Sequence, residues 1–191
     1  MVVGATGTIG REVVGQLAVM GRQVRAVSRN PETAGLPLSV EAVHADLARP
    51  ETLDRSLEGI ETVFLIWTAP PATAEPALER IANRAKRIIY LSAPLNVQHP
   101  FFQKPQPNPS SVLHARIERL IEASGLEWTF LRPGMFAANA LWFWGPQIRA
   151  GDVVRWPHLA APTAPIDERD IAAVAVRALC EEGHTAVRTI S

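Results

Sequence analysis

The sequence alternates short apolar runs with segments of helical period, and this alternation limits the possible folds more than any other feature. Apolar runs typical of strands occupy residues 1–4, 23–28, 40–44, 62–68, 87–92, 127–132 and 186–190. Segments with apolar residues three or four positions apart lie at residues 9–20, 50–58, 73–84, 110–124 and 168–181. This order predicts an α/β fold with a doubly wound parallel sheet.

Length and composition bound the organisation of the chain. Its 191 residues, 47% of them hydrophobic and 20% charged, predict one globular domain spanning residues 1–191. The strand-helix pattern is lost in residues 136–165, so we expect an irregular segment there. Prolines cluster between positions 94 and 109 and predict a second irregular connection.

The charge balance excludes several classes of partner. Because 19 Lys and Arg residues balance 19 Asp and Glu residues, no strong field attracts nucleic acid or anionic lipid. Cys180 is the only cysteine, which excludes an intramolecular disulfide. No apolar run reaches the roughly 18 residues that span a bilayer, and no charged leader follows Met1. We therefore expect a cytoplasmic protein that binds neither nucleic acid nor membrane.

A glycine-rich turn joins the first strand to the first helix. Between a strand and a helix, Gly4 permits a tight turn, Gly7 lets the backbone approach a pyrophosphate, and Gly10 lets helix and strand pack closely. The free N–H groups at the helix start would face the phosphates. We expect a dinucleotide site formed here by Gly4, Thr6, Gly7, Thr8, Ile9 and Gly10. The alternative is a tight turn that binds nothing.

The end of the second strand indicates which dinucleotide binds. NAD-binding units place a carboxylate about 20 positions after the glycines, and here Ser28 and Arg29 occupy that place, with no carboxylate before Glu32. A guanidinium binds a 2′-phosphate that a carboxylate would repel. The sequence therefore favours NADP(H), with NAD(H) possible, and Arg11 offers a second positive group. Alternatively, Arg29 is a solvated arginine at the start of a loop.

The motifs resemble the short-chain dehydrogenase/reductase superfamily, and within it the atypical NmrA-like NAD(P)-binding proteins. The resemblance covers nearly the whole chain. It is carried by the glycine turn, Val27-Ser28-Arg29, His44-Ala45-Asp46-Leu47, Leu65-Ile66-Trp67-Thr68-Ala69-Pro70, Tyr90-Leu91-Ser92-Ala93, Ser124 to Phe136 with Asn139, Pro165-Ile166-Asp167 and Asp170-Ile171-Ala172.

The resemblance implies positions for further cofactor contacts. Asp46 and Leu47 would border the adenine, and Thr68 and Ala69 would lie along the ribose and pyrophosphate. Residues from Pro133 to Phe136 would approach the nicotinamide. In the alternative interpretation, Asp46 caps the helix that begins at Pro50.

The chain departs from the superfamily in its catalytic residues. Typical members use a Tyr-x-x-x-Lys pair, whereas Ser110 and His114 stand at the matching helix positions here. His114 can donate a proton near neutral pH or bind a ribose, unless it is a partly exposed histidine paired with Glu118. Ser92 matches the superfamily's serine after the fifth strand and would orient a substrate.

The absence of the proton-donating tyrosine of the Tyr-x-x-x-Lys pair favours one class of acceptor. Hydride transfer to a quinone or similar conjugated molecule gives a stabilised anion that water can protonate. The first hypothesis is therefore an NADP(H)-dependent oxidoreductase acting on a small quinone-like acceptor, with residues 136–165 facing the substrate. An apolar wall of Phe136, Trp142, Phe143 and Trp144 would stack on the acceptor or, alternatively, would pack on the core.

The second hypothesis is a non-catalytic redox sensor that binds a dinucleotide and a regulatory protein partner. A sugar-nucleotide epimerase is a third and more distant reading, since that chemistry relies on the absent tyrosine. Members of the group usually continue past the helix at Asp170 into a small lobe that covers the substrate, so we expect this lobe to be reduced or missing. The sequence leaves the oligomeric state open.

Overall fold

The structure, a computed structural model, describes residues 1–94, 109–151, 153–156, 165–181 and the backbone of 186–190. Within these ranges the main sheet has seven strands in the order β3-β2-β1-β4-β5-β6-β9. Every neighbouring pair runs parallel. The strands are β1 (Val2–Val3), β2 (Arg25–Ser28), β3 (Glu41–His44), β4 (Thr62–Ile66), β5 (Arg87–Leu91), β6 (Glu127–Pro133) and β9 (Ala186–Ile190).

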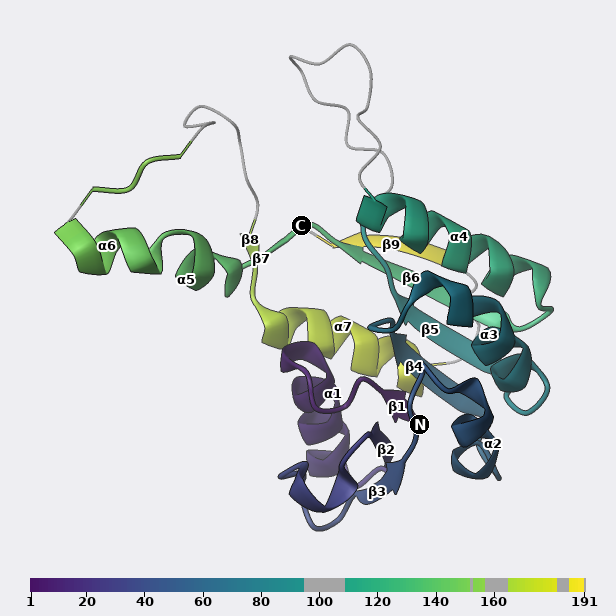
Figure 1. Ribbon diagram of the computed structural model, residues 1–191. Coiled ribbons are helices and arrows are strands. Elements are labelled where there is room, and N and C mark those ends of the chain that lie inside the picture. Colours follow the sequence, from purple (N-terminus) through teal and green to yellow (C-terminus); the bar gives the residue numbers. More distant parts are fainter. Residues whose placement is uncertain (95–108, 152, 157–164, 182–185, 191) are drawn as a thin grey trace.

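Helices cover both faces of this sheet (Figure 1). Two of them, α1 (Thr8–Val19) and α7 (Glu168–Cys180), pack together on one face. The other face is covered by α2 (Leu53–Ser56), α3 (Ala74–Ala82) and α4 (Pro109–Ala123). The predicted doubly wound α/β fold is therefore confirmed.

Burial on two faces explains why the central strands are almost continuously apolar. All five residues of β5 are buried, and alternate side chains of β4 and β5 enter opposite core clusters. Leu65 and Tyr90 belong to the cluster under α2, α3 and α4, whereas Phe64 and Ile89 belong to the one under α1 and α7. Each strand therefore contributes apolar surface to two cores, as expected for a parallel sheet.

The order of the strands reverses between β1 and its neighbour β4. Strands β2 and β3 continue from one side of β1, and β4, β5 and β6 continue from the other. At such a reversal, the connections leave the carboxyl ends of adjacent strands in opposite directions and a crevice remains between them. The topology therefore places a cavity at the carboxyl edge of the sheet, next to the glycine turn.

The expectation of an irregular segment at residues 136–165 is wrong for the part that the structure describes. It contains α5 (Asn139–Phe143) and α6 (Gly145–Gly151), and two-residue strands, β7 (Met135–Phe136) and β8 (Pro165–Ile166), pair at its ends. In Figure 1, α5 and α6 extend to one side of the sheet. Residues 152 and 157–164 of the segment, and 95–108 of the proline-rich connection, lie outside the described residues.

Smaller differences concern helix ends and short turns. The helix expected at 50–58 is a 3-10 turn, η2 (Pro50–Thr52), followed by the short α2. Similar turns, η1 (Pro31–Thr33) and η3 (Pro71–Thr73), also begin at prolines. Proline suits these first positions because it lacks the N–H that would go unpaired there. Among the described residues, no helix is both long and apolar enough to cross a membrane.

Candidate functional site

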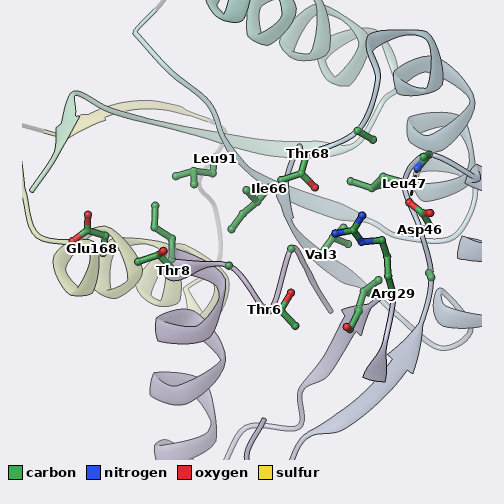
Figure 2. Close-up of a pocket in the computed structure, with 18 of the residues that line it drawn as sticks. Val3, Thr6, Thr8, Arg29, Asp46, Leu47, Ile66, Thr68, Leu91 and Glu168 are labelled. Carbon is green, nitrogen blue, oxygen red and sulfur yellow. Dashed lines mark hydrogen bonds between the residues drawn. The ribbon is translucent and has the colours of Figure 1, made fainter. Parts of the chain in front are cut away.

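A cavity of about 590 Å³ opens at the carboxyl edge of the sheet. Its lining comes from the loops after β1, β2, β3 and β4, the end of β5, and the first residues of α1, α5 and α7. Figure 2 shows Arg29 and Asp46 toward one end of the cavity and Glu168 toward the other. Segments far apart in the sequence therefore meet at the topological switch point, where open α/β sheets bind ligands.

The glycine turn forms the middle of the cavity wall. Gly4 has a φ of +84°, and a Cβ atom on it would lie 2.8 Å from Cβ of Ile66, so only glycine fits this turn without strain. A Cβ atom on Gly10 would lie 2.1 Å from the carbonyl oxygen of Gly4, which explains how α1 approaches β1 so closely. Gly10 is buried and does not line the cavity, so its position indicates a packing role.

The start of α1 offers hydrogen-bond donors to the cavity. Gly7 occupies the N-cap position, no side chain caps the helix, and its first turn contains no acidic residue. The exposed residues Thr6, Gly7 and Thr8 line the cavity, together with the buried Ile9. An uncapped helix start carries free N–H groups and the positive end of the helix dipole, so it suits an anion such as a diphosphate.

One end of the cavity lies over the carboxyl ends of β2 and β3. Ser28 and Arg29 line it, and the Ser28 hydroxyl accepts a hydrogen bond from the Asn30 N–H at 3.1 Å. Among the described residues, the exposed Arg29 guanidinium has neither an ion pair nor a hydrogen bond with the protein. Its five donors are therefore available to a ligand.

Asp46 and Leu47 line the same end, after β3. The Asp46 carboxylate accepts a hydrogen bond from the Ala48 N–H at 2.9 Å, and its other oxygen lies 3.8 Å from Nε of Arg49. No side chain caps the turn that begins at Pro50, so the alternative in which Asp46 is a helix cap is wrong. Asp46 shapes its own loop and still faces the cavity.

Arg11 does not supply the second positive group expected of it. Its guanidinium donates to the carbonyl oxygens of Thr6, Ala34 and Gly35 at 3.1, 2.7 and 3.2 Å. It lines no part of the cavity. Its contacts instead fasten the loop after β2 to the glycine turn.

The loop after β4 forms another part of the wall. Thr68 is exposed and Ala69 half-buried, and both line the cavity. The Ala69 carbonyl accepts a hydrogen bond from Nε1 of the buried Trp67 at 2.7 Å. This contact holds the loop against the core, so the lining residues are presented by a fixed backbone.

The far end of the cavity is formed by residues distant in sequence. Leu91 ends β5, Phe136 lies in β7, Asn139 and Trp142 lie on α5, and Glu168 begins α7. Oε1 of Glu168 accepts a hydrogen bond from the Ala138 N–H at 2.9 Å and so links the starts of α5 and α7. Sequence reasoning had not selected Asn139 or Glu168 for the site, because only the fold brings α5 and α7 to this edge.

Of the four residues expected to form an aromatic wall, only Phe136 and Trp142 line the cavity. Phe143 and Trp144 do not line the cavity. They pack against Trp156, with ring centroids 5.1 and 6.0 Å apart. Trp142 has 80% of its surface exposed, so it stands at the cavity mouth rather than in the core.

The two candidate catalytic residues, Ser92 and His114, do not line the cavity, and neither does Pro133 at the end of β6. Ser92 is buried, and its hydroxyl has no hydrogen-bond partner among the described residues. Nδ1 of His114 lies 2.5 Å from the Tyr90 hydroxyl oxygen. The predicted partner of His114, Glu118, instead binds Arg132 through both oxygens, at 2.9 and 2.5 Å.

The Tyr90 and His114 pair is poorly suited to proton transfer at neutral pH. Burial, and secondarily the negative charge of Glu118, raise the pKa of Tyr90 well above its usual range. Burial lowers the pKa of His114, and the charge of Glu118 opposes that change. Both groups therefore stay neutral at this pH and share one hydrogen bond between the tyrosine oxygen and Nδ1 of the histidine. The pair joins α4 to β5 in the core.

A parallel sheet in this strand order, with a glycine turn and an uncapped helix start at its switch point, defines a Rossmann-type dinucleotide-binding protein. The NAD(P)H-binding family matches residues 4–182 of the sequence. The chain therefore belongs to the NAD(P)H-binding family. The resemblance to NmrA-like proteins fits this membership.

Named relatives of the chain include reductases. It is 38% identical over 192 residues to the (4-alkanoyl-5-oxo-2,5-dihydrofuran-3-yl)methyl phosphate reductase of Streptomyces griseus, covering 96% of this chain and 64% of the relative. It is 32% identical to the NAD(P)H azoreductase of Xenophilus azovorans, with the same coverage. The chain thus spans 64% of the length of these relatives.

A solved structure has the same fold. The NADPH complex of the NADPH-dependent quinone oxidoreductase of Escherichia coli aligns with a TM-score of 0.84 and 23% identity. The alignment covers 100% of this chain and 68% of the other.

Proposed function

We propose that this protein is an NADP(H)-dependent oxidoreductase that transfers hydride from the nicotinamide to a quinone-like or other conjugated small molecule. The observation that carries the proposal is the cavity, which runs from Arg29 past the α1 N-terminus to Glu168 (Figure 2) and is also lined by Phe136 and Trp142. One end suits a phosphorylated adenosine and the other an aromatic ring. The reductase relatives support the same reaction class.

The residues present fit NADP(H). The N–H groups at the start of α1 would bind the pyrophosphate, with Gly4, Thr6, Gly7, Thr8 and Ile9 around it. Ser28 and Arg29 would bind the 2′-phosphate, because no carboxylate stands at the end of β2 to bind a free 2′-hydroxyl. Asp46 and Leu47 would border the adenine, and Thr68 and Ala69 the ribose and pyrophosphate. NAD(H) would bind more weakly because it lacks the 2′-phosphate.

The bound cofactor supplies a hydride, and the chain's own residues bind, orient and shield it. Phe136 and Trp142 provide apolar surface for a flat acceptor, and Asn139 offers a neutral amide beside them. Because Ser92 and His114 lie outside the cavity lining, we assign them no proton-transfer role. An acceptor whose reduced form takes its proton from water suits such a site better than a simple ketone.

Steady-state oxidation of NADPH tests this proposal. With a panel of quinones and conjugated enones, we expect turnover with several members and none with simple ketones. Binding of NADPH and NADH should be measured alongside by nicotinamide fluorescence. Tight NADPH binding with no turnover above background would contradict the reductase proposal and leave the binding proposal intact.

Neither Ser92 nor His114 belongs to the described lining of the cavity, and this favours a second candidate, a non-catalytic redox sensor. In that case, a regulatory protein partner would bind or leave according to the cofactor. Affinity capture in the presence of NADPH, of NADP⁺ or of neither would identify such a partner. A partner whose binding ignores the cofactor would count against a sensor function.

A further inference from the structure

We propose that Glu168 makes the site distinguish the redox state of the nicotinamide, so that the oxidised form binds more tightly than the reduced form. The inference rests on the proposed binding of NADP(H). It concerns the end of the cavity opposite Arg29, where Figure 2 shows the Glu168 side chain.

The orientation of the dinucleotide follows from the positions of its charged groups. The pyrophosphate belongs at the start of α1, and the phosphorylated adenosine half belongs beside Arg29 at the end of β2. The other half must then lie across the glycine turn, over the ends of β4 and β5. Ile66, Leu91, Phe136 and Glu168 line this part of the cavity. Glu168 is therefore on the nicotinamide side.

The carboxylate of Glu168 forms no ion pair with any of the described residues. Arg29 and Asp46 are the other charged residues of the described lining, and Figure 2 shows both at the opposite end. The next residue, Arg169, binds the Asp167 carboxylate through Nε and a terminal nitrogen, at 3.0 and 2.9 Å. The field of Glu168 in this half of the cavity is therefore not cancelled by an ion pair.

The carboxylate is also held in place. One oxygen accepts the Ala138 N–H at 2.9 Å, and the residue stands in the first turn of α7, where the helix dipole favours a negative charge. Its second oxygen has no hydrogen-bond partner among the described residues. A fixed charge needs no reorganisation to act on the ring, so the carboxylate does not have to move when the charge of the ring changes.

Hydride transfer changes the charge of the ring that faces Glu168. The dihydronicotinamide is neutral, and when hydride leaves its C4 with both bonding electrons, the ring becomes a cation while the acceptor gains one hydrogen and two electrons. A nearby carboxylate attracts the cation and has little effect on the neutral ring. Glu168 therefore lowers the free energy of the oxidised cofactor on the protein, which makes bound NADPH a stronger hydride donor.

The ratio of the two dissociation constants isolates this effect. NADPH and NADP⁺ carry the same phosphates, so the contacts of Arg29 and of the α1 N-terminus cancel in the ratio. We expect the wild-type protein to bind NADP⁺ more tightly than NADPH. In Glu168→Gln, which still accepts the Ala138 N–H, the preference should shrink about tenfold through weaker NADP⁺ binding, as expected for one partly solvated charge pair.

Calorimetric titration with each cofactor form makes the measurement without turnover. Glu127→Gln is the matched control, because Glu127 is exposed at the amino end of β6, on the opposite edge of the sheet, and the variant has the same net charge. Glu168→Asp keeps the charge and should keep most of the preference. A mainly structural role for Glu168 would weaken both forms equally and leave the ratio unchanged.

The possible failures are distinguishable. If the wild-type protein binds NADPH as tightly as NADP⁺, or if Glu168→Gln leaves the ratio unchanged, the inference is wrong and NADP(H) binding stands. If neither form binds the wild-type protein, the proposed function itself fails. The comparison of NADP⁺ and NADPH on the wild-type protein shows whether the oxidised form is preferred, even if the glutamine variant does not fold.

Discussion

Residues of the glycine turn and the arginine at the end of β2 have different roles, although they line or border one cavity. Gly4 lets the turn lie close to the side chain of Ile66, and Gly10 lets α1 approach the backbone of the turn, because an added Cβ atom would lie 2.8 Å from Ile66 and 2.1 Å from Gly4, respectively. Arg29, in contrast, is exposed and makes no contact with the described protein that a ligand would have to break. Substitutions at the two kinds of position should therefore affect different quantities, stability in one case and affinity in the other.

Arg29→Ala should weaken NADPH binding about 10- to 100-fold, because hydrogen bonds to a charged group are worth about 1.5–3 kcal/mol. NADH lacks the 2′-phosphate, so its affinity should change less than about twofold. Fluorescence titration with both cofactors checks this. Arg22→Ala serves as control, because Arg22 is exposed and lines no part of the cavity. Equal weakening of NADPH and NADH would show that Arg29 does not bind the 2′-phosphate.

Gly10→Ala should destabilise the fold by about 3 kcal/mol, the upper range for forcing an extra methyl group into a packed site. The new Cβ atom would lie 2.1 Å from one backbone atom of Gly4 and 2.8 Å from another, so α1 must move away from β1. Gly15→Ala in the same helix is the control. Nothing lies within 4 Å of its Cβ position, and alanine should stabilise the helix by about 0.5–1 kcal/mol. Urea unfolding should show a lower free energy of unfolding for Gly10→Ala and a higher one for Gly15→Ala.

At the scale of elements, side chains of α4 bind side chains of the sheet through polar contacts that include a hydrogen bond and an ion pair. His114 of α4 binds Tyr90 of β5, and Glu118 of α4 binds Arg132 of β6. Glu118 has only 4% of its side chain exposed, whereas Arg132 has 23%. Buried polar groups need their partners, so these contacts define how α4 sits on the sheet.

Glu118→Gln should cost about 2 kcal/mol, less than the 3–5 kcal/mol of a fully buried broken pair, because the arginine left behind is partly solvated. Chemical unfolding measures the loss. Glu122→Gln is the control on the same helix, since Glu122 is exposed, and it should stay within about 0.5 kcal/mol of the wild-type protein. A loss in Glu118→Gln no larger than in the control would show that the ion pair adds nothing to stability.

The His114 contact predicts a pH dependence of stability. Burial lowers the pKa of His114 in the folded state, so the unfolded chain takes up its proton first as the pH falls below about 6.5. The free energy of unfolding should therefore be constant with respect to His114 above that pH. It should decline below that pH until His114 is protonated in the folded state as well. Unfolding curves between pH 7.5 and pH 5, in steps of about half a unit, should show a shallower decline in His114→Gln than in the wild-type protein. An identical slope in the two proteins would contradict this assignment.

Most elements were predictable from the sequence because they bury a periodic face. The helix expected at 9–20 is Thr8–Val19, and the strand expected at 87–92 is Arg87–Leu91. The short α5 and α6 were not predictable, because they have no buried residue and hence no contrast between two faces. Apolar residues recur at helical spacing only where one face of a helix is buried against a core. A helix outside the core therefore has no such spacing of apolar residues.

At the scale of the whole molecule, cofactor binding should appear as added stability. A ligand that binds only the folded state adds about 2.7 kcal/mol at a free concentration of 100 times its Kd. For a chain of this size, NADPH at that concentration should raise the Tm by about 5–10 °C, and its removal by dialysis should reverse the shift. NADH at the same concentration should give a smaller increase. A Tm unaffected by NADPH would contradict the proposed binding.

The sequence by itself determined the local features of this protein. The alternation of strands and helices, the glycine turn and the lack of a carboxylate beside Arg29 all depend on neighbours in the chain, and they identified the fold and one half of the cavity. Only the tertiary structure decided which distant residues complete the site. It brought Asn139 and Glu168 to the cavity, kept only Phe136 and Trp142 of the expected aromatic wall there, and left Ser92, His114 and Pro133 outside its lining. The physical reason is that the direction of a helix and the face it presents depend on packing over the whole sheet, which no local pattern records.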